Sequence, residues 1–310
     1  MTELSRKIRI ALPSKGLLAN GSKQLLADVG LPVYNPNPRQ YIAWIQALPD
    51  VEVIFQRPGD IVISVRDGSV DFGITGRDIY LEKKDANGSI LELQNRLGFG
   101  RCTLNVIVPD DWQAVTILND LREVQARLGR PLRVATKFPK LVADFFSSSI
   151  DIAIEVIQAE GALEIAPTVG YADLIVDLVS TGTTLRDNRL KKLNGGLVLE
   201  AEACLIASRK RLSTSQETLE TAKLLLEMIG AHLRGKQNLA VFANIRAQSE
   251  DEIAEKITGQ EVIGGLQGPT ISRILSQGQN EFFAIHIVVK RDALPKAVRE
   301  LRAIGGSGVI

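Results

Sequence analysis

Short apolar runs alternate with helix-like segments along residues 8–185, and this alternation constrains the fold more than any other feature of the sequence. The runs at 7–12, 70–74, 131–135 and 152–157 are rich in β-branched and aliphatic residues, as buried strands are. Most are followed by a small-residue turn and then by apolar residues at helical spacing. The pattern predicts an α/β fold with mostly parallel, doubly wound sheets.

The chain is long enough for two lobes and a further domain. A strong β run at 103–108 predicts a crossover to a second lobe near residue 101, and a strand at 195–208 predicts the return after residue 185. We expect the two lobes to face each other across a cleft. The expected boundaries are 1–101 with 185–212 for lobe I, 102–184 for lobe II, 213–236 for a connecting helix and 237–310 for a final domain.

The final domain has a different pattern. Its expected strands are 239–247, 261–263, 282–290 and a last one from 308, with helices at 249–257 and 292–304. This βαββαβ order is the ferredoxin-like split motif, an α+β unit. A compact appended domain of this size is more often regulatory or oligomerising than catalytic.

Charge and composition exclude several function classes. The formal net charge of +1 gives no bulk field for nucleic acid or an anionic membrane, so neither is expected as a partner. No segment reaches transmembrane length, and two cysteines fit a reducing compartment, so we expect the cytoplasm. Only two histidines occur, far in sequence from the cysteines, which disfavours a histidine triad or a zinc site.

The stretch 164–187 contains the strongest candidate site. A strand-like run at 174–179 ends in Ser180–Thr184, where small hydroxyl residues surround Gly182. Such a turn can direct several backbone N–H groups at one anion. Asp177 lies in the run and Asp173 four residues earlier, on the same strand face if pairing is regular. The pattern predicts a sugar-phosphate site, and the alternative is a capped strand-to-helix connection without a ligand.

Five basic residues follow or end predicted strands. The carboxyl ends of parallel strands form the edge at which open α/β sheets bind ligands. These residues could therefore reach the cleft, although each could equally be a solvated turn charge. They are Lys15, Arg57, Arg77, Arg101 and Lys137.

The stretch 164–185 resembles the signature of the ATP phosphoribosyltransferases, which open histidine biosynthesis. The matching residues are Glu164, Gly170, Ala172, Ile175, Asp177, Leu178, Thr181, Gly182, Thr184 and Leu185. Segments 8–16, 71–80, 97–102 and 134–139 agree, so the resemblance spans nearly the whole chain. It implies a two-lobed, periplasmic-binding-protein-like catalytic core. It also implies attack of adenine N1 of ATP on phosphoribosyl pyrophosphate with release of pyrophosphate, and dimers that assemble into hexamers.

The resemblance also implies roles for residues, with Mg²⁺ as cofactor held mainly by the substrate pyrophosphate on protein ligands that stay unknown. The expected catalytic residues are Asp177, Glu164 and Arg57. The expected phosphoribosyl pyrophosphate residues are Asp173, Asp177, Ser180, Thr181, Gly182, Thr183 and Thr184. The expected ATP and pyrophosphate residues are Lys15, Gly16, Arg39, Arg57, Gly76, Arg77, Arg101 and Lys137. For Glu164, direct contact with substrate and ordering of the 180–184 loop stay open.

Segments 242–244, 268–272 and 284–289 resemble the histidine-sensing domain of the long-form enzymes. They imply that histidine binds as an inhibitor, between subunits, at Asn244, Thr270 and Ser272. A purely oligomerising domain is the alternative. The chain departs from its relatives at Leu17, where an arginine is usual, at Pro58–Gly59, where acidic residues are usual, and in its short C-terminus.

Two other functions stay open from the sequence. One is a two-lobed binding module without catalysis, which a complete signature disfavours. The other is a phosphoribosyltransferase for another base, because no residue that recognises adenine can be identified from the sequence.

Overall fold

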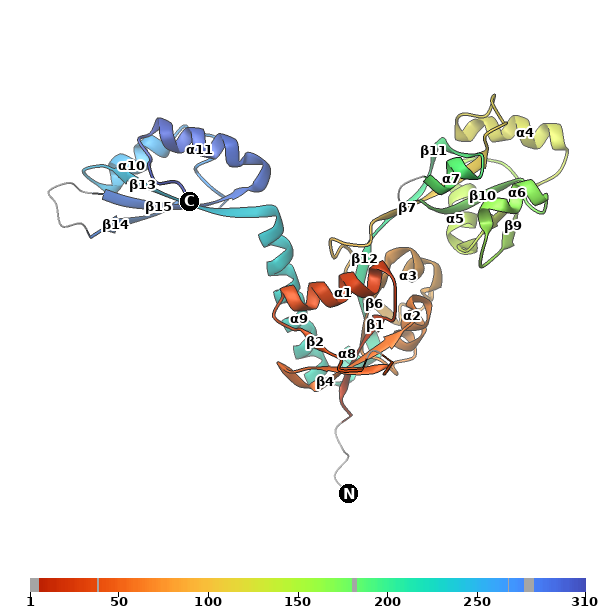
Figure 1. The fold of residues 1–310 in the computed structure, drawn as a ribbon, viewed down its shortest axis with the longest axis horizontal. Coiled ribbons are helices and arrows are strands. Elements are labelled where there is room, and N and C mark those ends of the chain that lie inside the picture. Colours follow the sequence, from red (N-terminus) through yellow and green to blue (C-terminus); the bar gives the residue numbers. More distant parts are fainter. Residues whose placement is uncertain (1–5, 38, 180–182, 267, 276–281) are drawn as a thin grey trace, which may run out of the picture. The chain divides into compact units, whose positions relative to one another are not determined.

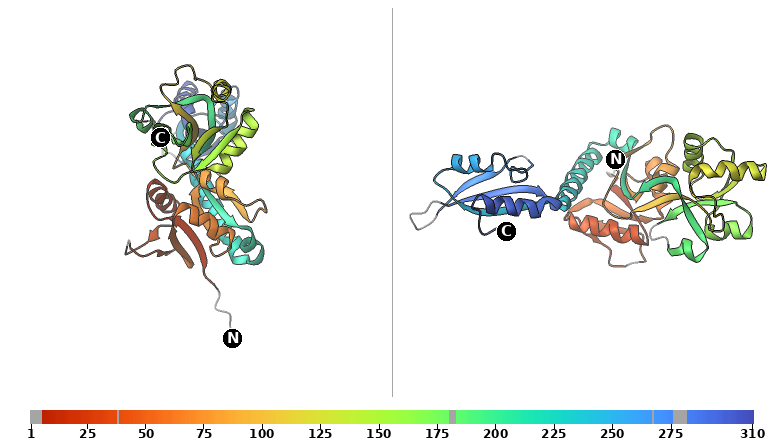
Figure 2. Two further views of the ribbon diagram at one scale, coloured as in Figure 1. Left: turned by 90° about the vertical axis from the view of Figure 1, so that its right-hand side faces the viewer. Right: turned by 90° about the horizontal axis from the view of Figure 1, so that it is seen from above.

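A computed structural model describes residues 6–37, 39–179, 183–266, 268–275 and 282–310 of the chain (Figure 1). It divides into two compact units, residues 1–229 and 230–310. The first unit contains two sheets with their helices, and the second contains one (Figures 1 and 2). In the described part of the chain, no helix is long and apolar enough to cross a membrane.

The first sheet has seven strands in the order β2-β3-β4-β1-β5-β12-β6. Its centre is parallel: Pro13 of β1 lies beside Gln56 of β4, and Ala11 lies beside Gly73 of β5. The strands are β1 (Ile8–Pro13), β2 (Val33–Tyr34), β3 (Ile42–Ile45), β4 (Leu48–Gln56), β5 (Phe72–Gly76), β6 (Ile90–Gln94) and β12 (Ala203–Ser208). The helices are α1 (Leu17–Asp28), α2 (Pro58–Arg66), α3 (Arg77–Lys83) and α8 (Arg209–Thr214).

The second sheet has five strands in the order β11-β7-β10-β8-β9, of which β8, β9 and β10 are parallel. The strands are β7 (Cys102–Pro109), β8 (Leu132–Thr136), β9 (Ile154–Gln158), β10 (Leu174–Val179) and β11 (Leu190–Ala201). The helices are η1 (Leu118–Asp120), α4 (Leu121–Leu128), α5 (Pro139–Ser149), η2 (Leu163–Ile165), α6 (Ala166–Val169) and α7 (Thr183–Asp187).

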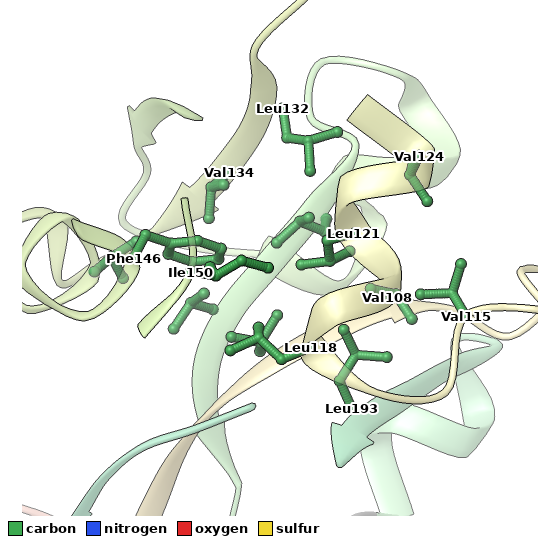
Figure 3. Close-up of a cluster of buried hydrophobic side chains, with 14 of the residues drawn as sticks. Val108, Val115, Leu118, Leu121, Val124, Leu132, Val134, Phe146, Ile150 and Leu193 are labelled. Atoms are coloured by element: carbon green, nitrogen blue, oxygen red, sulfur yellow. The ribbon is translucent and has the colours of Figure 1, made fainter. Parts of the chain in front are cut away.

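Both faces of the second sheet are buried. Figure 3 shows one face, where Leu121 of α4 and Phe146 of α5 pack over Val134 of β8. On the other face, Ile175 of β10 packs with Leu163 of η2. Burial on both faces explains why these strands are continuous apolar runs rather than alternating ones. The predicted α/β class with doubly wound sheets is confirmed here, although β7 and β11 at one side are antiparallel.

The chain passes between the two sheets twice. The first crossover precedes Cys102, where β7 begins. The return differs from the expectation, because the predicted strand 195–208 is two strands, β11 in the second sheet and β12 in the first. Glu202 is the single residue between them.

The connecting helix also begins later than predicted. Helix α8 ends at Thr214 and α9 (Gln216–Gln237) follows after Ser215. The hydroxyl of Ser215 accepts the N–H of Thr218, while the hydroxyl of Thr214 donates to the carbonyl of Lys210. Ser215 therefore caps α9.

The second unit contains β13 (Asn238–Arg246), α10 (Glu250–Ile257), β14 (Thr270–Ile274), β15 (Phe282–Lys290), η3 (Arg291–Ala293) and α11 (Leu294–Ala303). The sheet order is β13-β15-β14, and residues 307–310 pair antiparallel with β13 on its free side. Both helices lie on one side of this sheet (Figure 1), with Ile253 of α10 and Leu301 of α11 in its core. The arrangement is ferredoxin-like, as predicted.

One strand of this unit was predicted in the wrong place. Residues 261–263 form no strand; the backbone N–H groups of Val262 and Ile263 donate to the Glu300 carboxylate at 2.8 and 3.0 Å. The second strand of the motif is β14 instead, at Thr270–Ile274.

Candidate functional site

The carboxyl ends of the parallel strands in the first sheet bring together several of the predicted site residues. Gly16, Arg57 and Gly76 directly precede α1, α2 and α3. Because β1 and β4 end in register at Pro13 and Gln56, Lys15 and Arg57 lie at the same edge, and both are exposed. Gly16 has a φ of 81°, which a residue with a side chain adopts only under strain. The sequence thus places a basic edge here.

Arg77 lies at this edge but is already paired. Its Nε donates to Glu92 on β6 at 2.6 Å. This hydrogen bond raises the pKa of Arg77 above its usual value. Leu17 is 82% exposed at the start of α1. The edge therefore offers Lys15 and Arg57 as charges with freedom to bind.

A pocket of about 400 Å³ lies where the two crossovers meet. Two arginine side chains on its lining are well exposed: those of Arg96 and Arg101 are 72% and 81% exposed. Two glutamates, Glu200 and Glu202, lie on its lining. The lining is Arg77, Asn95, Arg96, Arg101, Cys102, Thr103, Val179, Glu200, Ala201 and Glu202.

This pocket reaches the carboxyl end of β10. Val179 lines it and pairs across the sheet with Thr103, whose hydroxyl donates to the carbonyl of Val179 at 3.2 Å. Val179 directly precedes the predicted phosphate loop. Residues 180–182 of that loop lie outside the described residues, and Thr183 and Thr184 begin α7. The loop's role therefore stays a prediction.

Asp177 lies two residues before the end of β10, opposite Asn105 of β7. Burial raises the pKa of its carboxyl, the charge of Lys137 opposes that rise, and the charge of Glu164 adds to it. These three predicted residues therefore lie close enough to interact. Lys137 directly follows β8, where the hydroxyl of Thr136 accepts the N–H of Phe138 and so fixes the turn.

Asp173 lies elsewhere. It directly precedes Leu174, at the end of β10 opposite to the predicted loop, four residues before Asp177. Its carboxylate accepts hydrogen bonds from Arg130 at 2.7 and 2.8 Å and from the backbone and side chain of Arg133 at 2.8 and 2.9 Å. Burial alone would raise the pKa of Asp173, but these hydrogen bonds outweigh burial and lower it far below its usual value. These contacts occupy the carboxylate within the protein, and binding of phosphoribosyl pyrophosphate by Asp173 stays a prediction.

Arg39 is not brought to the pocket. It is exposed in the loop between β2 and β3, where its backbone N–H donates to the side chain of Asn37. No group of three or more ligating residues suited to a metal ion occurs in the described ranges.

The three predicted effector residues share one face of the C-terminal sheet. Thr270 pairs with His286, which pairs with Phe242, and Ser272 pairs with Ala284, which pairs with Asn244. Alternate residues such as Val241 and Ile285 are buried under the helices, so these two rows point to the opposite face. The rings of Phe242 and His286 stack there, with centroids 4.1 Å apart.

The sequence did not predict several residues that line the arginine pocket. Arg96, Thr103 and Glu202 line the pocket but belong to no recognised turn at a strand end. The available signal was the acidic residue at 202 between two apolar strands, since a charge in such a run calls for a partner.

Comparisons with known proteins match nearly the whole chain. The family model "HisG: ATP phosphoribosyltransferase" matches residues 57–230, and "HisG, C-terminal domain" matches 236–310. ATP phosphoribosyltransferase 2, chloroplastic, of Arabidopsis thaliana is 43% identical over 98% of this chain and 75% of its own length. ATP phosphoribosyltransferase of Gemmatimonas aurantiaca is 36% identical over 98% of this chain and 97% of its own.

A similar fold occurs in a solved structure of an ATP phosphoribosyl transferase (HisG:HisZ) complex from Thermotoga maritima. The TM-score is 0.56 at 22% sequence identity, over 73% of this chain and 98% of that one.

Proposed function

The chain belongs to the ATP phosphoribosyltransferase family, and on that premise we propose that the arginine pocket and the carboxyl end of β10 form one active site. The protein is the enzyme of the first step of histidine biosynthesis. It transfers the phosphoribosyl group of phosphoribosyl pyrophosphate to N1 of ATP and releases pyrophosphate. One observation carries the site assignment: Val179, which precedes the signature loop, lines the same pocket as Arg77, Arg96 and Arg101.

The reaction assigns separate tasks to the two sides of this site. Positive charge develops on the ribose as pyrophosphate leaves, so a nearby carboxylate and cationic groups stabilise opposite parts of the transition state. Asp177, backed by Glu164 and Lys137, lies where the ribose would be held if the loop after Val179 takes the 5′-phosphate. Arg96 and Arg101 then neutralise the departing pyrophosphate.

ATP is proposed to bind along the basic edge of the first sheet. Lys15 and Arg57 are exposed there, and the backbone turns at Gly16 and Gly76 open onto the same edge. No enzyme nucleophile is needed, because adenine N1 attacks the anomeric carbon directly. Alignment of two bound substrates can lower the barrier by about 7–11 kcal/mol.

Magnesium is proposed to enter with the substrate. The guanidinium groups on the pocket lining suit the oxygens of a metal–diphosphate complex. Mg²⁺ on the diphosphate would add to the neutralisation that the arginines supply.

For the C-terminal unit we propose that histidine binds on the open sheet face at Thr270, Ser272 and Asn244. These residues lie in two adjacent rows of one face and are exposed. Hydroxyl and amide groups can satisfy the ammonium and carboxylate of an amino acid. Assembly into dimers and hexamers belongs to the same proposal.

The test of the activity uses the purified chain with ATP, phosphoribosyl pyrophosphate and Mg²⁺. We expect pyrophosphate release together with N1-phosphoribosyl-ATP, identified by its mass and ultraviolet spectrum. Release of pyrophosphate only with another nucleotide or base would assign a different acceptor, and no release would leave a binding function.

A further inference from the structure

Glu202 ties the two crossovers together. It is the one residue between β11 and β12, and its backbone carbonyl accepts the N–H of Arg77 at 2.9 Å. Next to it, Ala203 exchanges hydrogen bonds with the first crossover: its N–H donates to Phe99 and its carbonyl accepts from Leu97. The segments 97–101 and 201–203 therefore form one hydrogen-bonded joint, although about a hundred residues separate them.

The Glu202 side chain extends this joint into the pocket. Its carboxylate is only 9% exposed, and Oε2 accepts the N–H of Gly98 at 2.9 Å. The Nε atoms of Arg96 and Arg101 lie 3.8 and 3.9 Å from its two oxygens. Gly98 has a φ of 82°, so this part of the crossover depends on a backbone geometry that favours glycine.

Stability alone is a weak reason for this arrangement. Burying a carboxylate is unfavourable unless it is well paired. The two guanidinium groups are mostly exposed and almost 4 Å away, and exposed pairs of this kind contribute little to stability. The contacts are, however, well suited to keeping two arginines over the pocket while leaving their donors available to phosphate oxygens.

We infer that Glu202 is a positioning residue that holds Arg96 and Arg101 over the diphosphate-binding part of the pocket and fixes the Gly98 crossover beneath them. The inference rests on the proposed function of the pocket. Glu202 touches no reacting atom in this scheme. It acts through the arginines, which engage the phosphates from a position already set.

The first test compares Glu202→Gln with Glu200→Gln. Both substitutions remove one negative charge from the lining of the same pocket. Of the two glutamates, Glu202 is the one that contacts Gly98, Arg96 and Arg101 within the described residues. An effect that both variants share is electrostatic. We expect Glu202→Gln alone to lower kcat/KM for phosphoribosyl pyrophosphate by about tenfold and to raise the inhibition constant of the product pyrophosphate.

The second test is a double-mutant cycle in a background where Arg96 and Arg101 are both replaced by alanine. If Glu202 acts through these two arginines, Glu202→Gln should lower kcat/KM by less than about twofold in that background. Glu202→Asp keeps the charge but shortens the reach, and it should fall between the wild type and Glu202→Gln. Thermal unfolding of each variant separates loss of folded protein from these kinetic changes.

The outcomes distinguish failure of the proposed function from failure of the positioning role. If the wild type forms no N1-phosphoribosyl-ATP, the proposed function fails. If the wild type is active and Glu202→Gln matches Glu200→Gln, or Glu202→Gln is fully additive with the combined replacement of Arg96 and Arg101 by alanine, the positioning role is wrong.

Discussion

At the scale of single residues, the two acids of the signature stretch have opposite surroundings. Asp177 is half-buried beside Lys137 and Glu164, whereas the Asp173 carboxylate accepts four hydrogen bonds from Arg130 and Arg133. A carboxylate that is fully hydrogen-bonded within the protein has little capacity left for a ligand. The two residues should therefore respond differently to the same Asp→Asn substitution.

Asp177→Asn should act on catalysis. The change keeps the shape and removes the charge that would stabilise a developing oxocarbenium ion. We expect kcat to fall by about tenfold or more, a loss of ~1.4 kcal/mol of transition-state stabilisation. Steady-state kinetics with varied phosphoribosyl pyrophosphate measures this, and an unchanged kcat/KM would reject the role.

Asp173→Asn should act on stability instead. It removes the negative charge and turns one of the two acceptor oxygens facing Arg130 and Arg133 into an NH2 donor, which we expect to lower the free energy of unfolding by about 1–3 kcal/mol at pH 7. Urea unfolding measures the loss. A large rise in KM for phosphoribosyl pyrophosphate with unchanged stability would return Asp173 to the binding site.

The effect of Asp173→Asn on the free energy of unfolding should depend on pH. The pKa of Asp173 is lowered in the folded chain, so its stabilising contribution is complete above the unfolded value of about 3.9 and is lost as the pH falls toward the folded value. The difference in unfolding free energy between wild type and Asp173→Asn should therefore shrink below about pH 4. Unfolding curves at neutral pH and near pH 3 would show it, and a difference that stays constant would contradict it.

At the scale of elements, the cores follow from the sequence pattern. Phe146 of α5 packs against the second sheet (Figure 3), and its side chain is only 1% exposed. Its neighbour Phe145 is partly buried. Phe146→Ala should lower the free energy of unfolding by about 3–5 kcal/mol because it leaves a cavity. Phe145→Ala, as the matched control, should cost clearly less; equal losses would show that this core is packed differently.

Some elements could be predicted from the sequence and others could not. Buried parallel strands such as β8 and β10 could be predicted because local composition decides them. The false strand at 261–263 could not be excluded, since its N–H groups are taken by Glu300, a contact made about 37 residues away. The basic edge at Lys15 and Arg57 could be predicted from the rule that parallel strands end together. The pocket at Arg96 and Glu202 could not, because it exists only where two distant crossovers meet.

At the scale of the whole molecule, catalysis and regulation are proposed for different units. The described residues form two compact units, 1–229 and 230–310. The C-terminal unit has its own core, built around Ile253, Ile285 and Leu301. A ligand of this unit could act on the reaction only by biasing states of the first unit, which is allosteric coupling.

Histidine inhibition tests that division. We expect L-histidine to inhibit the full chain, and a chain ending at Arg234, checked to be folded and active, to have lost the inhibition.

Thr270→Val gives a sharper test within the intact chain, because it removes one exposed hydroxyl while keeping the side-chain volume. Loss of one hydrogen bond, worth about 0.5–1.5 kcal/mol, should weaken histidine inhibition roughly 2–13-fold while leaving the uninhibited kcat unchanged. By linkage, substrates should change the affinity for histidine by the same factor with which histidine changes theirs. Calorimetry of histidine binding with and without ATP would measure that factor. Equal inhibition of the full and shortened chains would place the histidine site in the first unit, and no inhibition of either would leave the C-terminal unit an oligomerising one.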